Sequence, residues 1–197
     1  MDSKHALELI VGLGNPGQQY QATRHNAGAM FVAALCQAYQ AELKPEPGFF
    51  GLGARINIMG RSLRLLFPTT FMNHSGKAVA AISQYYKIRP EHILIAYDEL
   101  DFDVGTVRLK TGGGHGGHNG VRDIIKAVGD SGFHRLRIGI GHPGDPARVL
   151  NHVLGEPSKQ DAELIHDSIA RAIDVTPLLA AGEWQTAMNR LHTRPEL

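Results

Sequence analysis

LIVGLGNPGQQYQATRHNAG, residues 9–28, opens with three apolar residues and continues into glycine, asparagine and proline. The short apolar run is typical of a strand buried on both faces, and the turn residues at positions 12–17 end it. Asn15 therefore lies just past the carboxyl end of a strand, and His25 follows in the same stretch. In open α/β sheets the crevice beyond these strand ends binds ligands, so we expect both residues to belong to a functional site.

Gly12, Gly14 and Gly17 also match the spacing G-x-G-x-x-G of a dinucleotide-binding turn. That turn needs a helix that begins at the glycines and an acidic residue about 20 positions further on. Residues 18–24 are polar without helical periodicity, and no Asp or Glu occurs between Gly17 and Glu42. A nucleotide-binding oxidoreductase is therefore disfavoured.

The remaining pattern predicts an α/β fold, with a single-domain mixed β-sheet surrounded by α-helices. Two apolar runs separated by a short polar turn predict an antiparallel hairpin, while other runs predict buried strands. The two prolines within residues 44–48 predict a break in the chain, and residues 69–75 predict a polar loop. We expect strands at 9–11, 49–58, 63–67, 93–97, 106–110 and 133–140, and helices at 27–39 with Asn26 as N-cap, 79–86, 121–128 and two or three after 150.

The composition is that of a compact protein with one hydrophobic core. With 197 residues and 43% hydrophobic content, the chain is expected to form one domain over residues 1–197. The N-terminus has no secretory signal pattern and no apolar run approaches membrane-spanning length, which predicts a cytoplasmic protein without membrane contact. The single cysteine, Cys36, stands in an apolar stretch and is interpreted as a buried hydrophobe rather than a nucleophile.

Charge is unevenly distributed along the chain, although the net charge is only +1. Residues 104–150 contain seven basic and three acidic residues, a balance of +4, and residues 155–183 contain two basic and six acidic residues, a balance of −4. The basic segment also holds the glycine-rich stretch 112–120. Ordinary solvated surface and a docking site for a polyanion are both compatible with this pattern.

Polar residues at predicted strand ends and loops supply the candidate chemistry. A histidine with a carboxylate partner suits general-base catalysis, because the carboxylate selects the ring tautomer and stabilises the imidazolium. Asparagine amides can orient a water or bind a carbonyl oxygen without titrating. The alternative is that the asparagines are turn residues and helix caps. The candidate residues are Asn15, His25, Asn73, Asp98 and Asn119.

Two other kinds of site are disfavoured by their surroundings. His115 and His118 have the H-x-x-H spacing of metal ligands, but glycines flank both and no cysteine lies nearby, so we expect no metal site. Ser75 lacks the G-x-S-x-G pattern of a serine hydrolase.

Several long motifs follow one another along nearly the whole chain: GLGNPG at 12–17 with Tyr20, TRHNAG at 23–28, PTTFMN at 68–73, DELD at 98–101, the glycine-rich segment 112–120 and RLRIGIG at 135–141. In this order they resemble the motifs of bacterial peptidyl-tRNA hydrolases. The resemblance implies a metal-free, cofactor-free monomeric enzyme that hydrolyses the ester between a peptide and the 3′-end of tRNA, and so recycles tRNA in translation.

The resemblance also implies roles for individual residues. His25 would be the general base that activates water, Asp98 would hold and polarise it, and Asn15 would help to discriminate blocked from free aminoacyl groups. The sequence departs from the usual motif at His74, where an apolar residue is common, and at Pro146, where a lysine often stands. The implied substrate contacts are Asn73 and Asn119 for substrate and water, Tyr20, Phe71 and Met72 for the cleft, and Lys110 and Arg137 for tRNA phosphates.

Taken without the resemblance, the residues predict a water-activating hydrolase beside a basic surface. A non-enzymatic RNA-binding module is the main alternative, and the placement of His25 and Asp98 disfavours it.

Overall fold

The computed structural model describes residues 6–193. The two ends of the expected domain, 1–5 and 194–197, lie outside the described residues. The described chain forms one seven-stranded sheet in the order β2-β3-β4-β1-β5-β7-β6. The strands are β1 Leu9–Gly12, β2 Lys44–Glu46, β3 Gly51–Ile58, β4 Arg61–Pro68, β5 Ile93–Glu99, β6 Val107–Thr111 and β7 His134–Gly139.

The sheet is mixed, as the sequence predicts. β1 lies in its centre and runs parallel to both β4 and β5, and β5 runs parallel to β7. The pairs β2 with β3, β3 with β4, and β6 with β7 are antiparallel. All four residues of β1 are buried, which agrees with a strand covered on both faces.

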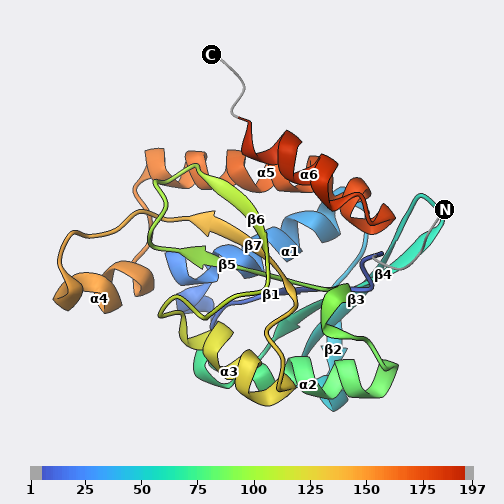
Figure 1. Ribbon diagram of the computed structural model, residues 1–197. Helices are drawn as coiled ribbons and strands as arrows, with labels where there is room; N and C mark the ends of the chain where they lie inside the picture. Colours follow the sequence, from blue (N-terminus) through green and yellow to red (C-terminus); the bar gives the residue numbers. More distant parts are fainter. Residues whose placement is uncertain (1–5, 194–197) are drawn as a thin grey trace.

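Helices cover both faces of the sheet (Figure 1). One hydrophobic cluster joins α1, α5 and α6 to one face, and a second joins α2 and α3 to the other. Cys36 lies buried in the first cluster, as expected. The helices are α1 Ala27–Ala38, α2 Ser75–Tyr86, α3 Asn119–Val128, α4 Val149–Leu154, α5 Lys159–Ala181 and α6 Trp184–His192.

Two of the predictions about local structure are wrong. Lys44–Glu46 does not break the chain but forms the edge strand β2 against β3. An edge strand tolerates Pro45, because the backbone N–H that proline lacks is not needed to bond a further strand on the open side. Asn26 precedes α1, but its side chain does not cap the helix and bonds to the backbone of Asn15 instead.

Two glycines allow α1 to start directly against the ends of β1 and β5. A Cβ built on Gly12 would lie 2.2 Å from the carbonyl oxygen of Gly28, and one built on Gly28 would lie 2.0 Å from that of Ala96. Only glycine permits such close approach of two backbones. The packing brings the turn that precedes α1, and with it His25, to the carboxyl end of β5.

Candidate active site

The candidate site lies where the central parallel strands end. Gly12 of β1 pairs in register with Ala96 of β5, so Asn15 and Asp98 reach the same edge of the sheet. Asp98 is the penultimate residue of β5 and its side chain is almost fully buried. His25 comes from η3, Arg24–Asn26, a single turn just before α1. Residues distant in sequence thus meet at the crevice that the strand pattern predicted.

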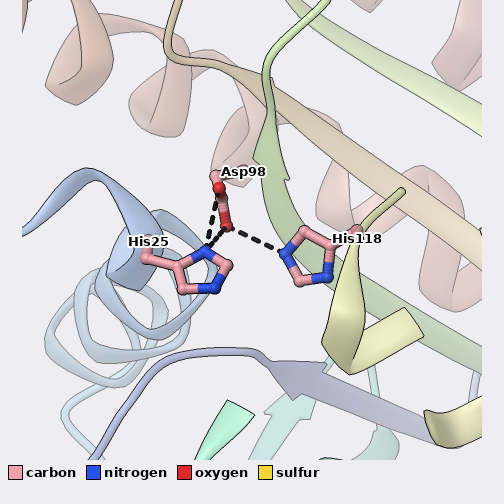
Figure 2. A group of neighbouring side chains, drawn as sticks. All are labelled: His25, Asp98 and His118. Atoms are coloured by element: carbon pink, nitrogen blue, oxygen red, sulfur yellow. Dashed lines mark hydrogen bonds and ion pairs between the residues drawn. The ribbon is translucent and has the colours of Figure 1, made fainter. Parts of the chain in front are cut away.

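His25 and Asp98 form a closely bonded pair. His25 Nδ1 lies 2.9 Å from Asp98 Oδ1 and 3.0 Å from Oδ2 (Figure 2). An ionised carboxylate only accepts, so Nδ1 carries the proton and Nε2 keeps its lone pair. Burial alone would lower the pKa of His25, but the charge of Asp98 and its hydrogen bond outweigh burial and raise the pKa above its ordinary value.

His118, which the sequence suggested only as a candidate metal ligand, is the third member of this cluster. Its Nε2 lies 3.0 Å from Asp98 Oδ1, on the side opposite His25 (Figure 2). His118 is also the N-cap of α3, and its Nδ1 accepts the N–H of Val121 at 3.3 Å. Because Nδ1 is an acceptor there, the ring proton lies on Nε2 and points at Asp98. Its position just before a predicted helix was the available sequence signal.

Asp98 remains ionised under this double interaction. Burial would raise the pKa of its carboxyl, but the electrostatic interactions with His25 and His118 and the hydrogen bonds from both rings outweigh burial and hold the pKa well below its usual range. The site therefore holds a buried anion between two imidazoles, one of which has a free basic nitrogen.

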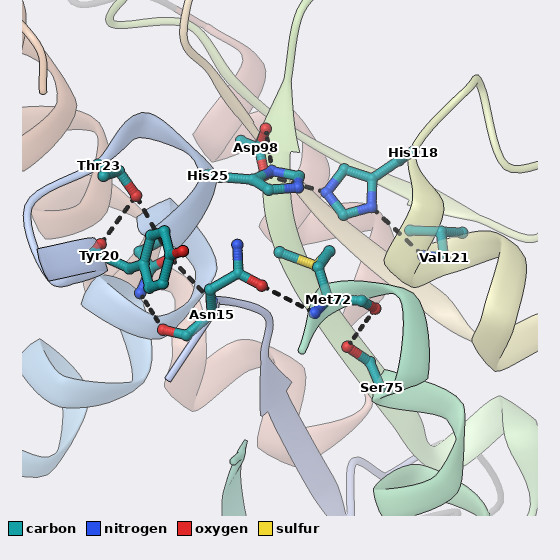
Figure 3. A network of polar contacts seen from close by, with 10 residues as sticks. Asn15, Tyr20, Thr23, His25, Met72, Ser75, Asp98, His118 and Val121 are labelled. Carbon is teal, nitrogen blue, oxygen red and sulfur yellow. Dashed lines mark hydrogen bonds and ion pairs between the residues drawn. The ribbon is translucent and has the colours of Figure 1, made fainter. Parts of the chain in front are cut away.

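Asn15 presents its amide nitrogen to the crevice. Its Oδ1 accepts the N–H of Met72 at 2.8 Å, which leaves the NH₂ group on the side facing His25 (Figure 3). Its backbone N–H and carbonyl are both bonded to the side chain of Asn26, at 2.9 Å each. These bonds fix the residue from both ends, so the crevice meets a donor rather than an acceptor.

Asn73 and Asn119 lie on two elements that pack against each other, η5 Met72–His74 and the first turn of α3. Both side chains are exposed. Asn119 accepts a hydrogen bond from Arg122 at 3.0 Å. The structure therefore brings the predicted asparagines to one region. Neither Asn73 nor Asn119 caps a helix, as they would if these asparagines were only turn residues and helix caps.

The three predicted cleft residues differ in exposure. Met72 is 4% exposed and its N–H is used by Asn15, whereas the neighbouring Phe71 is 57% exposed. Tyr20 is half-buried in η2, Gln18–Tyr20, and its carbonyl accepts the hydroxyl of Thr23 at 2.8 Å. Phe71 thus offers an open aromatic surface beside the site.

Basic residues line one face of the neighbouring antiparallel strands β6 and β7. Lys110 lies opposite Arg135, and Arg108 opposite Arg137, so all four project from the same face. This is the face that α3 covers. Phe133 lies two residues before Arg135, and so on the same side of the chain, and it packs in the cluster of α2 and α3. Arg137 is partly neutralised by Glu99, 2.8 Å away, whereas Lys110 is exposed and has no acidic partner among the described residues.

A further pocket wall comes from α4. Val149, Leu150 and Val153 face His25, Asp98 and His118 across a cavity of about 430 Å³. Pro146, of η7 Pro146–Arg148, also lines it. The crevice beside the cluster is therefore apolar on the α4 side.

The two histidines of the H-x-x-H pair bond to different partners. His115 Nδ1 accepts the N–H of Gly117, while His118 turns to Asp98. A different set, His25, Asp98 and His118, does offer three donor atoms within 4.8 Å of one another. Their spacing is equally explained by the two ring protons that bond to the carboxylate.

Known proteins match this chain over nearly its whole length. The sequence profile of the family described as Peptidyl-tRNA hydrolase matches residues 9–196. A peptidyl-tRNA hydrolase of Pectobacterium carotovorum subsp. carotovorum is 55% identical over 188 residues, which cover 95% of this chain and 96% of the relative. One of Pseudomonas syringae pv. syringae is 53% identical over 190 residues, 96% of this chain and 98% of the relative.

Solved structures give the same result. A crystal structure of a peptidyl-tRNA hydrolase in complex with N-propanol has a TM-score of 0.96 and 49% identity, and covers 100% of both chains. That of the Acinetobacter baumannii peptidyl-tRNA hydrolase has a TM-score of 0.94 and 50% identity, and covers 98% of both. None of the helices in residues 6–193 is long and apolar enough to cross a membrane. By sequence and by fold, this chain belongs to the peptidyl-tRNA hydrolase family and cleaves peptidyl-tRNA.

Proposed function

We propose that His25 is the general base of the ester hydrolysis. Its Nε2 takes a proton from a water, whose oxygen bonds to the carbonyl carbon of the ester. When the tetrahedral intermediate collapses, the bond to the 3′-oxygen of tRNA breaks and the same proton passes from His25 to that oxygen. The products are free tRNA and the carboxylic acid of the peptide, which ionises by releasing the remaining proton of the water to solvent.

Asp98 supports this step without taking a proton itself. Its carboxylate keeps His25 in the tautomer with the lone pair on Nε2 and stabilises the imidazolium that forms. His118 holds the other side of Asp98 Oδ1, at 3.0 Å, and so restricts the carboxylate. The observation that carries the proposal is the bond between His25 Nδ1 and Asp98, because it leaves a basic nitrogen facing the crevice.

Asn15 accounts for a preference for blocked substrates. With its oxygen bonded to Met72, Asn15 offers only N–H donors to the crevice. A peptide or an N-acetyl group provides a carbonyl acceptor for these donors, whereas a free aminoacyl group provides a protonated amine that cannot accept a hydrogen bond. Asn73 and Asn119 are proposed to bind the substrate and water, and Tyr20, Phe71 and Met72 to line the cleft for the peptidyl-adenosine end.

The tRNA body is proposed to bind the basic face of β6 and β7 through Lys110 and Arg137. Phosphate oxygens would compete with Glu99 for Arg137, since guanidinium groups bind phosphate as readily as carboxylate. We also propose that the enzyme acts as a monomer in the cytoplasm, where peptidyl-tRNA arises during translation.

Release of free tRNA tests the proposal directly. N-acetyl-aminoacyl-tRNA should be cleaved, and the same tRNA carrying the unblocked amino acid should be cleaved far more slowly. Equal rates on both would remove Asn15 from the discrimination, and no release from either would contradict hydrolysis by this site.

The mechanism is proposed to need no metal, because His25 and Asp98 generate the nucleophile without a Lewis acid. We therefore expect turnover to survive exhaustive treatment with a chelator. Turnover that is lost after chelation and restored by Zn²⁺ would instead assign His25, Asp98 and His118 to a metal site.

A further inference from the structure

A second open groove borders the site between η5 with the start of α2 and the helix α3. It encloses about 590 Å³, and carbon atoms make up most of its exposed surface. Phe71, more than half exposed, forms one side. The residues that line it also include His74, Lys77, Asp123 and Lys126.

Both walls of the groove adjoin residues of the candidate active site. Phe71 directly precedes Met72, whose N–H holds Asn15. On the opposite wall, α3 begins at Asn119 and carries Lys126 two turns further along. At 1.5 Å per residue, the wall runs about 10 Å away from Asn119. Both walls therefore extend from residues of the candidate site toward the groove.

The groove also lies on the side of α3 away from the basic face. α2 packs against α3 and β4, whereas Lys110 and Arg137 belong to β6 and β7 at the other end of the sheet. The substrate has two parts joined at the ester, a nucleic acid and a peptide. If the nucleic acid follows the basic face, the α2 side remains for the peptide.

The charged side chains of the groove are mostly basic. Lys77 and Lys126 are exposed and have no acidic partner among the described residues, although the Lys77 ammonium lies 4.0 Å from the centre of the Phe50 ring. The one acid in the lining, Asp123, accepts the N–H of Gly76 at 2.7 Å and is turned toward the start of α2. Two lysines against one carboxylate leave the groove with a positive excess.

We propose that this groove binds the peptide part of the substrate, the residues that precede the esterified one, and that it favours acidic side chains there. The inference rests on the peptidyl-tRNA hydrolase activity of the family. Aromatic and alkyl surface from Phe71 and the lysine stems would contact any peptide, while the two ammonium groups would discriminate by charge.

Substrates of matched length test this preference. N-acetyl-tripeptidyl-tRNAs with one tRNA and one C-terminal residue would carry Glu, Gln or Lys at the two preceding positions. For each enzyme, kcat/KM is divided by that of the same enzyme on N-acetyl-aminoacyl-tRNA, which has no residue to place in the groove. The wild-type ratio should fall from Glu to Gln to Lys by about two- to fivefold per step, the size expected of exposed ion pairs.

Charge reversal provides the decisive variant. Lys77→Glu with Lys126→Glu should invert the order of the three ratios, and the double Gln variant should flatten it. Lys159→Glu, an exposed lysine at the start of α5, is the matched control and should keep the wild-type order.

Two outcomes would overturn the proposal. An unchanged order in the double Glu variant would mean that the groove does not contact the peptide. If the double Glu variant instead bound free tRNA more weakly and with a smaller salt dependence, the two lysines would be assigned to binding RNA. Neither outcome would contradict the hydrolase activity, because cleavage of N-acetyl-aminoacyl-tRNA by the wild-type enzyme measures that activity separately.

Discussion

His25 lies at the point where the chemistry is concentrated, since its Nδ1 is bonded to Asp98 and its Nε2 faces the crevice. We expect His25→Ala to lower turnover by roughly 10²- to 10⁴-fold, the usual effect of losing a general base. The side chain is 12% exposed and comes from a short turn, so the fold should persist. Circular dichroism would verify folding, and near-normal turnover in a folded variant would remove His25 from the mechanism.

Asp98→Asn tests whether the negative charge of Asp98 controls the pKa of His25. In the wild type the pKa of His25 is raised, and because the base must be neutral, activity should fall as the pH drops through that pKa. Removing the negative charge lowers the pKa of His25, so the acidic limb of the pH–rate profile should move to lower pH. The plateau of kcat/KM should also fall by at least about tenfold, since the imidazolium loses its partner.

The profile of kcat/KM against pH gives the pKa of the free enzyme and is the measurement required. An acidic limb that stays in place in Asp98→Asn would mean that Asp98 serves the fold and does not tune His25.

At the scale of elements, the glycine-rich segment between β6 and α3 delivers His118 and Asn119 to the site. A buried arginine holds this segment: the guanidinium of Arg135 donates to the carbonyls of Gly113 and Gly114 and, at 3.5 Å, to that of Ser131. Arg135 is 1% exposed and forms no ion pair with an acid in residues 6–193. Backbone carbonyls therefore take the place of a counterion.

We expect Arg135→Met to reduce the free energy of unfolding by about 1–3 kcal/mol, because the loop carbonyls lose their buried donor. Urea denaturation would measure the change. Arg108→Met, on the same face but exposed, is the matched control and should stay within about 0.5 kcal/mol of the wild type. Equal stability of the Arg135 variant would show that solvent replaces the arginine at no cost.

For the whole molecule, the charge segregation noted in the sequence becomes a separation across the sheet. The basic face of β6 and β7 lies on the α3 side, while the acidic segment forms much of α5, which packs on the opposite face. A polyanion approaching the protein is therefore attracted to one face and repelled from the other.

Binding of tRNA should accordingly weaken steeply with salt. Lys110→Ala or Arg137→Ala should reduce the slope of log affinity against log salt by up to about 0.9 for each lost phosphate contact. A substrate that keeps only the 3′-terminal nucleotide and its blocked amino acid should be affected much less than intact tRNA. If both substrates slowed equally with no change in slope, the two residues would belong to the active site or the fold.

Local patterns were enough to predict much of this protein. The apolar run before Gly12, the hairpin and the periodicity of α3 depend on neighbouring residues only, and each is present in the structure. Strand ends followed by Asn15 and Asp98 identified the crevice, because parallel strands end on a common edge. The boundaries differ by a few residues, as where β5 continues through Asp98 to Glu99.

What local patterns could not specify depends on contacts between distant segments. His118 joins the site because the glycine-rich segment turns its ring onto Asp98, and its tautomer follows from the N–H of Val121. The edge strand β2 exists because β3 offers it a partner, although Pro45 argues against a strand locally.

Asn15 shows most clearly which properties follow from the sequence and which are decided by the tertiary structure. Its residue type and its place after β1 followed from the sequence alone, and they made it a candidate for binding substrate. Whether it would present a donor or an acceptor was decided by Met72, 57 residues away, whose N–H occupies the amide oxygen. An amide has both functions, so only the tertiary contact that uses one of them leaves the other for the substrate.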